Sequence, residues 1–267
     1  MPRSPTTRPG APPTRARGPA VAARNADVPE PVDGFPRPLT SVDVAIFTVL
    51  DEVLKVLLVQ RPAGPGEPCP GRWALPGGFI DVHADLDLEA CARRKLQDKT
   101  QVRTPYLEQL GSWGGARRDP RGWSATHVYF ALIPGQDLAP TPGANAADVR
   151  WFPVDEALRG PALAFDHGEI LRAAVDRLRG KVEYTSLPAF LLAEPFTLPQ
   201  LQRVYEIVLD RPVDKSGFRT RMMAADFLEE AGVVRDRESN RPPMGYRLKD
   251  RRRAVVFPRT FGPRGAG

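Results

Sequence analysis

The stretch that decides the fold is Gly71-Arg-Trp-Ala-Leu-Pro-Gly-Gly-Phe79, which is followed by Leu88-Glu-Ala-Cys-Ala-Arg-Arg-Lys-Leu-Gln-Asp-Lys-Thr-Gln-Val102. The first part predicts a short strand over 72–75 that ends at the Pro-Gly-Gly turn. In the second part, Leu88, Ala92 and Leu96 recur at helical spacing, which predicts a helix with one apolar side. We therefore expect a strand, a glycine turn, a loop and a helix in this order.

The polar side of this expected helix is mostly cationic, because Arg94, Lys95, Asp98 and Lys99 are spaced to lie together on it. The stretch resembles the Nudix box, the metal-binding strand-loop-helix of the Nudix hydrolase superfamily. The helix of that box reads Arg-Glu-apolar-x-Glu-Glu-x-Gly-apolar. The same positions here are Arg94-Lys-Leu-Gln-Asp-Lys-Thr-Gln-Val102, so lysines stand at two places where the resemblance implies carboxylates.

These two lysines change the expected chemistry. Mg²⁺ requires hard oxygen ligands, and ammonium groups would both remove ligands and repel the ion. The same groups can pair with a pyrophosphate in the absence of metal, which predicts binding without turnover. A solvated helix side in a decayed site is the alternative. The loop after Gly78 is longer than is usual in the family, so the first acidic residue of the box stays open among Asp85, Asp87 and Glu89.

On either side of the box, the pattern predicts an α/β (α+β) domain with a mixed sheet and flanking helices. A hairpin is expected over 42–60 and a proline-rich loop over 61–70, both before the box. After it come strands over 106–113, 125–133 and 148–152 and a helix over 164–179. The Arg118-Asp-Pro-Arg-Gly122 segment is expected in a loop over 114–122.

The C-terminal part predicts a winged helix, a variant of the helix-turn-helix. Thr197 and Gln200 form a capping-box pattern before a helix that runs to Leu209. A second helical region is expected over 214–228 and is stopped by Gly232. Two strands, over 233–237 and 244–249, are expected to follow it.

Charge is distributed unevenly along the 267 residues, whose formal net charge is +6. The excess lies in residues 1–40 and after residue 200, whereas residues 41–200 are net acidic. A basic C-terminal module suggests a polyanionic partner. The two cysteines make no disulfide framework, and no apolar run is long enough to span a membrane, so we expect a cytoplasmic protein.

Nine stretches, the first of them from the box, extend the resemblance over most of the chain, which is similar to the Nudix-related transcriptional regulators of bacterial NAD metabolism. They are RWALPGGF (72–79), YLEQLGSWG (106–114), RDPRG (118–122), RWFPVDE (150–156), LAFDHGEIL (163–171), RLRGKVEYT (177–185), FTLPQLQRVYE (196–206), DKSGFRTRM (214–222) and RPPMGYRL (241–248). The resemblance implies a repressor of NAD synthesis or salvage genes. It also implies an ADP-ribose-like effector, a double-stranded DNA operator and no required cofactor. Helix-turn-helix proteins usually dimerise, so we expect a homodimer.

We expect four regions. They are a disordered Pro/Arg-rich tail (1–38), a Nudix-like effector-binding domain (39–186), a winged-helix DNA-binding domain (187–253) and a flexible tail (254–267). The resemblance implies effector contacts from the box and from the RDPRG segment: Arg72, Gly77, Gly78, Phe79, Arg94, Lys95, Asp98, Lys99, Arg118, Asp119 and Arg121. Basic residues and one aromatic residue of the C-terminal module are expected to meet DNA: Lys215, Phe218, Arg219, Arg221, Arg235, Arg237, Arg241 and Arg247.

Two other functions remain open at this point. An active nucleoside diphosphate hydrolase, cleaving ADP-ribose or a related compound with Mg²⁺, would use Glu89 and Asp98 as its remaining carboxylates. A winged helix can also serve as a protein-interaction module. Salt-dependent affinity for duplex DNA would favour the DNA-binding function over the latter.

Overall fold

The computed structural model describes residues 37–100, 106–135, 146–160, 162–234, 242–258 and residue 260. Residues 1–36 of the predicted tail over 1–38, and residues 259 and 261–267 of the one over 254–267, lie outside these ranges. In chain order the elements are β1 (Leu39–Leu50), β2 (Val53–Gln60), β3 (Trp73–Ala74), β4 (Gly77–Phe79), α1 (Leu88–Thr100), β5 (Tyr106–Asp119), β6 (Gly122–Leu132), β7 (Asp148–Pro153), α2 (Val154–Arg159), α3 (His167–Val182), the 3-10 helix η1 (Leu187–Leu191), β8 (Phe196–Thr197), α4 (Leu198–Leu209), α5 (Lys215–Ala224), β9 (Leu228–Val233) and β10 (Met244–Leu248).

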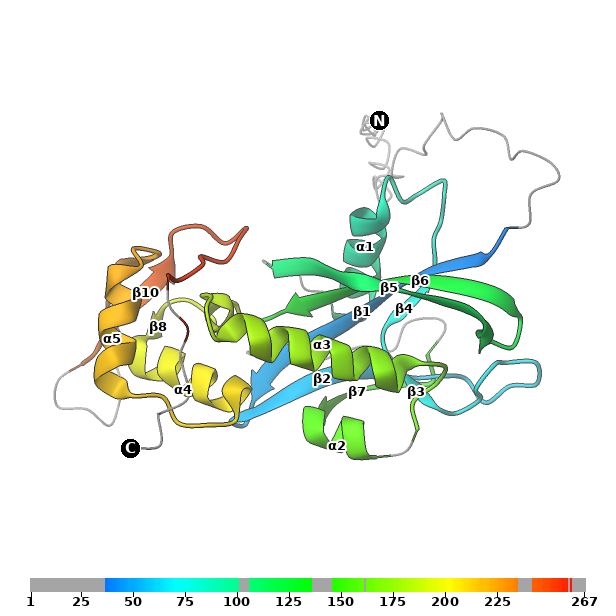
Figure 1. The fold of residues 1–267 in the computed structure, drawn as a ribbon, viewed down its shortest axis with the longest axis horizontal. Coiled ribbons are helices and arrows are strands. Elements are labelled where there is room, and N and C mark those ends of the chain that lie inside the picture. Colours follow the sequence, from blue (N-terminus) through cyan, green and yellow to red (C-terminus); the bar gives the residue numbers. More distant parts are fainter. Residues whose placement is uncertain are drawn as a thin grey trace, which may run out of the picture.

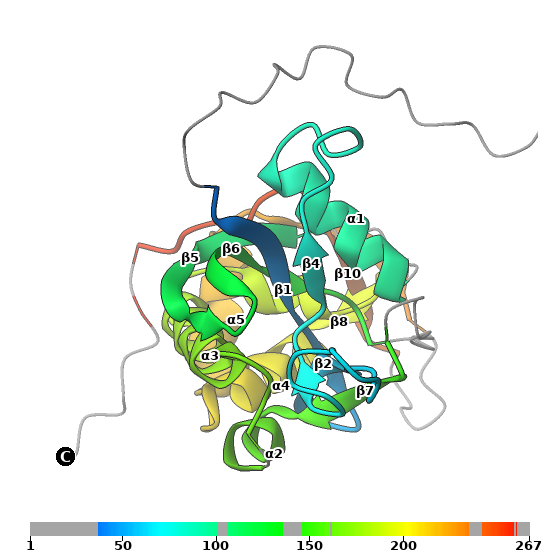
Figure 2. The same ribbon diagram turned by 90° about the vertical axis from the view of Figure 1, so that its right-hand side faces the viewer.

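The expected mixed sheet is confirmed. Its strands follow the order β3-β2-β1-β6-β5, with β4 also paired to β1 and β7 to β2. The long pairing of β1 with β6 is parallel, and the other pairings are antiparallel. Because β1 pairs with β4 near its start and with β6 along most of its length, the glycine turn and the β5–β6 hairpin lie beside the same end of the sheet (Figure 2).

Helices cover both faces of the sheet (Figures 1 and 2). Successive residues of a strand point to opposite faces, and the two cores of the molecule follow this alternation. Val42, Val44 and Ile46 of β1 pack with the buried side of α1 in one core. Ala45 and Phe47 pack with α3 in the other. The helix of the box and α3 therefore lie on opposite sides of β1.

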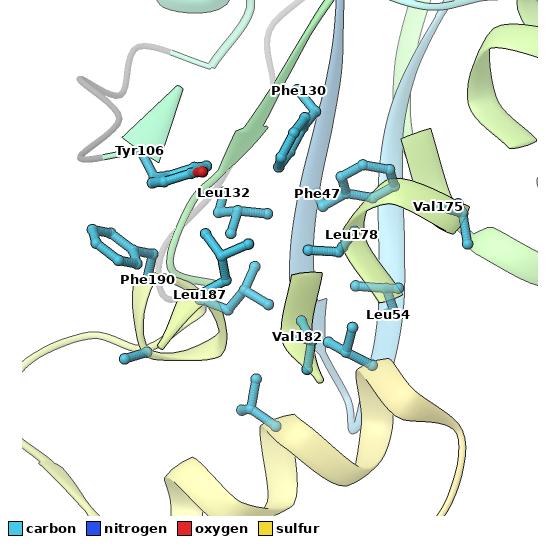
Figure 3. Packing of buried hydrophobic residues seen from close by; sticks show 14 of the residues in the cluster. Phe47, Leu54, Tyr106, Phe130, Leu132, Val175, Leu178, Val182, Leu187 and Phe190 are labelled. Carbon is cyan, nitrogen blue, oxygen red and sulfur yellow. The ribbon is translucent and has the colours of Figure 1, made fainter. Parts of the chain in front are cut away.

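The core on the α3 side continues into the C-terminal module. Figure 3 shows side chains of the sheet, such as Phe47 and Phe130, pointing toward Leu178 of α3 and Phe190 of η1. The same cluster includes the apolar side of α4 and Phe218 of α5. The chain that joins α3 to α4 is part of this core as well, because all five residues of η1 are buried. The two modules thus share one hydrophobic core in the described residues.

The C-terminal module has the helix, helix and hairpin order that we predicted. Its sheet has the order β8-β10-β9, and β9 and β10 form the antiparallel hairpin. The predicted capping box at the start of α4 is confirmed: the Gln200 backbone N–H donates to the Thr197 hydroxyl, and the Thr197 N–H donates to the Gln200 side chain. Asp214 caps α5 by accepting from the Gly217 N–H at 2.7 Å.

Several element boundaries differ from those expected. β5 continues to Asp119 because residues 114–119 pair with the start of β6, so the predicted loop over 114–122 is wrong. α2 is an additional helix that follows Pro153 directly. α5 ends at Ala224, and β9 then runs through Gly232, whose φ of +85° glycine tolerates, so Gly232 does not stop a helix. Ala254, Val255 and Phe257 of the expected flexible tail pack against the core, and Phe257 is buried.

Candidate functional site

A cavity of about 870 Å³ opens beside the box helix. It is bordered by β1, the Gly77–Phe79 strand β4, the polar side of α1, the end of the β5–β6 hairpin and the N-terminus of α3. Six cationic side chains line it: Arg61, Arg94, Lys95, Lys99, Arg118 and Arg121. Four acidic side chains line it as well: Asp43, Glu67, Asp98 and Asp119. The cavity therefore has an excess of positive charge and is suited to an anionic ligand.

Lys95 and Lys99 are the cations of this cavity that are least compensated. Neither forms a salt bridge within the part of the chain that the structure describes, although both lie near Asp98 on α1. The Lys95 Nζ atom lies over the glycine turn, 2.9 Å from the place that a Cβ atom of Gly78 would occupy. Burial lowers the pKa of Lys99, and Asp98 partly offsets this effect. Both ammonium groups face a space where an anion would neutralise them.

The three acidic residues left open by the long loop have other partners. Asp85 is buried and accepts two hydrogen bonds of 2.6 Å from the Arg94 guanidinium, which holds the pKa of that carboxyl well below its usual range. Asp87 accepts from the Ala90 N–H in the first turn of α1. Glu89 pairs with Arg93 on the exposed side of the helix. None of these three carboxylates lines the cavity. The two hydrogen bonds from Arg94 show that Asp85 fixes the position of that guanidinium within the box.

A buried network lies at the opposite wall of the cavity. Arg118 donates through Nε to Asp166 at 2.9 Å and lies 3.4 Å from Asp43 through Nη2. The Thr126 hydroxyl donates to the same oxygen of Asp43 at 2.7 Å. These side chains join β1, β5, β6 and the start of α3. The network therefore connects the sheet to α3 at the edge of the cavity.

His167 completes this network in its neutral form. The Leu75 N–H donates to its Nδ1 at 2.9 Å, so that nitrogen carries no proton. The ring proton is then on Nε2, which lies 3.6 Å from Asp43. Burial lowers the pKa of His167, and the neighbouring Asp43 opposes that shift. His167 thus fixes the backbone that precedes the glycine turn.

Gly77 is required by the close approach of β4 to β1. A Cβ atom at this position would lie 1.8 Å from the Asp43 Oδ1 and 2.7 Å from the Val42 carbonyl oxygen. A larger residue would displace Asp43 from the network with Arg118. This explains why a glycine stands at the first of the two positions of the turn.

Two aromatic rings add apolar surface to the polar cavity. The Arg121 guanidinium lies 4.9 Å from the centre of the half-exposed Phe79 ring, and Arg121 also pairs with Asp119, whose pKa it lowers. The Arg61 guanidinium lies 4.9 Å from the centre of the Phe165 ring. Phe165 has a φ of +52°, an unusual conformation for a bulky residue and one that is enriched at binding sites. Each ring has one side against a cation.

Ten of the eleven residues expected to contact an effector line this cavity, and the exposed Arg72 does not. Sequence reasoning missed Asp43, Arg61, Ser124 and Phe165. Of these, only Phe165 lies in one of the stretches that carry the family resemblance, LAFDHGEIL. The hydrolase alternative would use Asp98 and Glu89 as its remaining carboxylates. Of these two, Asp98 lines the cavity, whereas Glu89 lies outside it. Within the described ranges, no three His, Cys, Asp or Glu side chains form a group that suits a metal ion.

α5 presents a basic surface to the outside. Lys215 and Arg219 are exposed and lie one turn apart. Phe218 and Met222, each three residues further along the helix, adjoin these two cations but are buried. Phe218 packs edge-on against Tyr205 of α4, with ring centres 5.2 Å apart. The expectation that Phe218 contacts DNA is therefore wrong, because its apolar ring holds α5 on α4.

The remaining basic residues of the module have varied positions. Arg247 is exposed on β10, and Arg221 is half-buried and donates to the Thr260 carbonyl oxygen at 2.9 Å. Three of the expected DNA contacts lie outside the described residues: Arg235, Arg237 and Arg241. No helix among the described residues has the length and apolar character needed to cross a membrane.

Two family models match the chain in the order of its two modules. The NUDIX domain matches residues 39–174, and the NrtR DNA-binding winged helix domain matches residues 188–248. All residues that line the cavity, including those of its cationic helix, lie within the first range. α4, α5 and the β9–β10 hairpin lie within the second.

The chain is also similar to whole proteins. It is 42% identical over 225 residues to the "ADPR responsive transcriptional repressor NtrR" of Acinetobacter baylyi, covering 84% of this chain and 88% of that protein. Its structure is similar to that of Shewanella oneidensis NrtR complexed with a 27mer DNA, with a TM-score of 0.75, 44% identity and coverage of 83% and 99% of the two chains. A MutT/nudix family protein from Enterococcus faecalis gives a TM-score of 0.65 at 28% identity, covering 82% and 90%. The chain therefore belongs to the NrtR family of Nudix-related transcriptional repressors.

Proposed function

We propose that this protein represses bacterial NAD synthesis or salvage genes, and that ADP-ribose or a related nucleotide in its Nudix cavity alters its affinity for operator DNA. The observation that carries the proposal is the pair of ammonium groups, Lys95 and Lys99, which face the cavity without a carboxylate partner among the described residues. A pyrophosphate brings two adjacent negative charges to such a place. The name of the Acinetobacter relative supports ADP-ribose as the effector.

We further propose that the effector binds without a metal ion. Lys95 and Lys99 occupy positions where a Nudix hydrolase presents carboxylates, so they take over the neutralising role of Mg²⁺. Arg118 is positioned by Asp166 and Asp43 and supplies a third cation at the opposite wall. The rings of Phe79 and Phe165 offer surfaces on which an adenine can stack.

The proposed DNA contact is the exposed side of α5. Lys215 and Arg219 would enter the major groove, while Arg247 on the hairpin would meet the backbone. The Shewanella structure bound to DNA supports this role for the module. A homodimer acting in the cytoplasm would match the two half-sites of a pseudo-palindromic operator.

A gel shift on the DNA upstream of the gene tests the proposal. The protein should retard this fragment more strongly than an unrelated fragment, and its affinity should fall steeply as salt is raised. ADP-ribose should change the midpoint of the shift, whereas AMP at the same concentration should not. Replacing Arg219 with Ala should weaken binding by at least about fivefold, the lower range for a lost base contact.

Arg159→Ala is the matched control, because Arg159 is an exposed arginine on α2, in the Nudix domain and not in the winged helix. Equal retardation of specific and unrelated DNA, or no response to ADP-ribose, would contradict the proposal. Mg²⁺-dependent release of AMP from ADP-ribose would instead support the hydrolase function.

A further inference from the structure

Ser124 is a buried residue of the cavity wall, and its side chain forms no hydrogen bond within the described part of the protein. The residue is 2% exposed and lines the cavity. Its hydroxyl oxygen is buried and has no hydrogen-bond partner among the described residues. A buried polar group without a partner is costly to the folded state, and native proteins contain few of them. Such a group at a binding site indicates a partner that the ligand supplies.

The neighbouring hydroxyl groups show how unusual Ser124 is. Thr126 lies two residues further along β6, on the same side of the strand, and its hydroxyl donates to Asp43. The hydroxyl of Ser41, on the adjacent strand β1, donates to the Ala125 carbonyl oxygen at 3.4 Å. Both of these hydroxyls therefore have protein partners. Ser124 alone, of the three, is left for a ligand.

The Ser124 hydroxyl suits a sugar hydroxyl group as its partner. Lys95 and Lys99, the cations without a carboxylate partner among the described residues, belong to α1, and Arg118 of β5 is paired with Asp166 and Asp43. Ser124 lies on β6, two residues from Thr126. A serine hydroxyl both donates and accepts, as a sugar hydroxyl does, and a nearby carboxylate is a further acceptor. A dinucleotide-binding carboxylate commonly holds a ribose hydroxyl in the same way.

We infer that Ser124 is a specificity-determining residue that hydrogen-bonds a ribose hydroxyl group of the bound nucleotide. This inference rests on the proposed function, because it requires a nucleotide in the cavity. A ligand-binding role for Ser124 has one consequence that a purely structural role would not have. The hydroxyl of Ser124 lowers the stability of the empty protein and raises the affinity for the ligand.

The test compares the full-length protein with its Ser124→Ala and Ser112→Ala variants. Ser112 is an exposed serine of the adjacent strand β5 that lies outside the cavity, where it bonds His127. Calorimetric titration with ADP-ribose gives the affinity, and thermal unfolding without ligand gives the stability. Ser124→Ala should weaken ADP-ribose binding by roughly threefold to tenfold, as expected for one lost hydrogen bond. It should leave the melting temperature of the empty protein unchanged or raise it.

Each result decides the inference. Unchanged ADP-ribose affinity in Ser124→Ala, or a lower melting temperature of its empty form, would overturn it. A similar loss of affinity in Ser112→Ala would also overturn it, because the effect would not be specific to the cavity. If the wild-type protein binds no ADP-ribose, the proposed function itself fails. A parallel titration with ADP, which lacks the second ribose, shows which sugar is contacted: a loss confined to ADP-ribose indicates the second ribose, and a loss with both ligands indicates the ribose of adenosine.

Discussion

Lys95 and Lys99 illustrate how a few side chains can convert a site while its backbone frame is retained. The strand, the glycine turn and the helix keep the relation that a Nudix site needs, and Arg94 is still fixed by a buried carboxylate, Asp85. The positions that face the ligand now carry ammonium groups in place of carboxylates. The frame can therefore hold a pyrophosphate by direct charge pairing.

Replacing Lys95 or Lys99 with Gln should weaken ADP-ribose binding by roughly tenfold or more, because a hydrogen bond to a charged group is lost. Titration calorimetry without Mg²⁺ measures this loss. Lys249→Gln serves as the control, since Lys249 pairs with Asp226 in the winged helix, far from the cavity along the chain. Wild-type affinity that rises steeply with added Mg²⁺ would contradict metal-free binding.

Some residues of the site could be predicted from the sequence, and others could not. Lys95, Asp98 and Lys99 follow from the period of one helix, which places them on one side whatever the tertiary fold. Asp43 and Ser124 could not be found in this way. They lie on β1 and β6, far apart in the chain, and only the parallel pairing of these strands brings them to one wall.

At the scale of elements, the sequence predicted helices more reliably than the ends of strands. The capping box of α4 was visible in Thr197 and Gln200 because both of its hydrogen bonds are local. The glycines Gly114 and Gly115 looked like a turn, but pairing with β6 keeps them in β5. Long-range pairing overrode the local preference there. The true turn lies at Pro120 and Arg121, between the two strands.

The first turn of α5 depends on Asp214, which accepts the Gly217 N–H at its N-cap. Asp214→Ala should lose this cap, at a cost of about 1 kcal/mol, and loosen the helix that carries Arg219. Asp214→Asn loses the same charge but keeps an oxygen acceptor, so it is the matched control. The Ala variant should bind operator DNA more weakly than the Asn variant in a gel shift. Equal affinity of the two variants would show that the cap has no effect on DNA binding.

At the scale of the whole molecule, α3 connects the two proposed sites. It begins beside the cavity at His167 and ends next to α4, where Arg179 donates to the Val208 carbonyl oxygen at 3.2 Å (Figure 1). The segment after α3 is held from two directions. The Tyr205 hydroxyl of α4 donates to the Thr185 carbonyl oxygen at 2.7 Å, and the Phe257 N–H donates to that of Tyr184 at 2.7 Å. A change at the cavity can therefore reach the winged helix through packed elements.

The C-terminal segment, residues 254–258, is a testable part of this junction, because it lies beyond the range matched by the winged-helix model and yet contributes the buried Phe257. The Phe257 ring is 4% exposed and packs against Phe227, which precedes β9, with ring centres 6.0 Å apart. Phe257→Ala should lower the free energy of unfolding by about 3 kcal/mol, the lower range for a large buried aromatic residue. Chemical denaturation followed by circular dichroism measures this change.

Val256→Ala is the control for that prediction, because the Val256 side chain is 67% exposed, while its bridge to Thr185 involves the backbone alone. This variant should stay within about 0.5 kcal/mol of the wild-type protein. The Phe257 ring fixes the segment whose backbone N–H bonds Tyr184 between α3 and α4, so its loss should also reduce the effect of ADP-ribose on operator binding. If Phe257→Ala unfolds at the wild-type denaturant concentration, the C-terminal segment does not stabilise the junction. A normal response to ADP-ribose in a destabilised Phe257→Ala protein would show that the coupling between the two sites passes through α3 and α4 without the C-terminal segment.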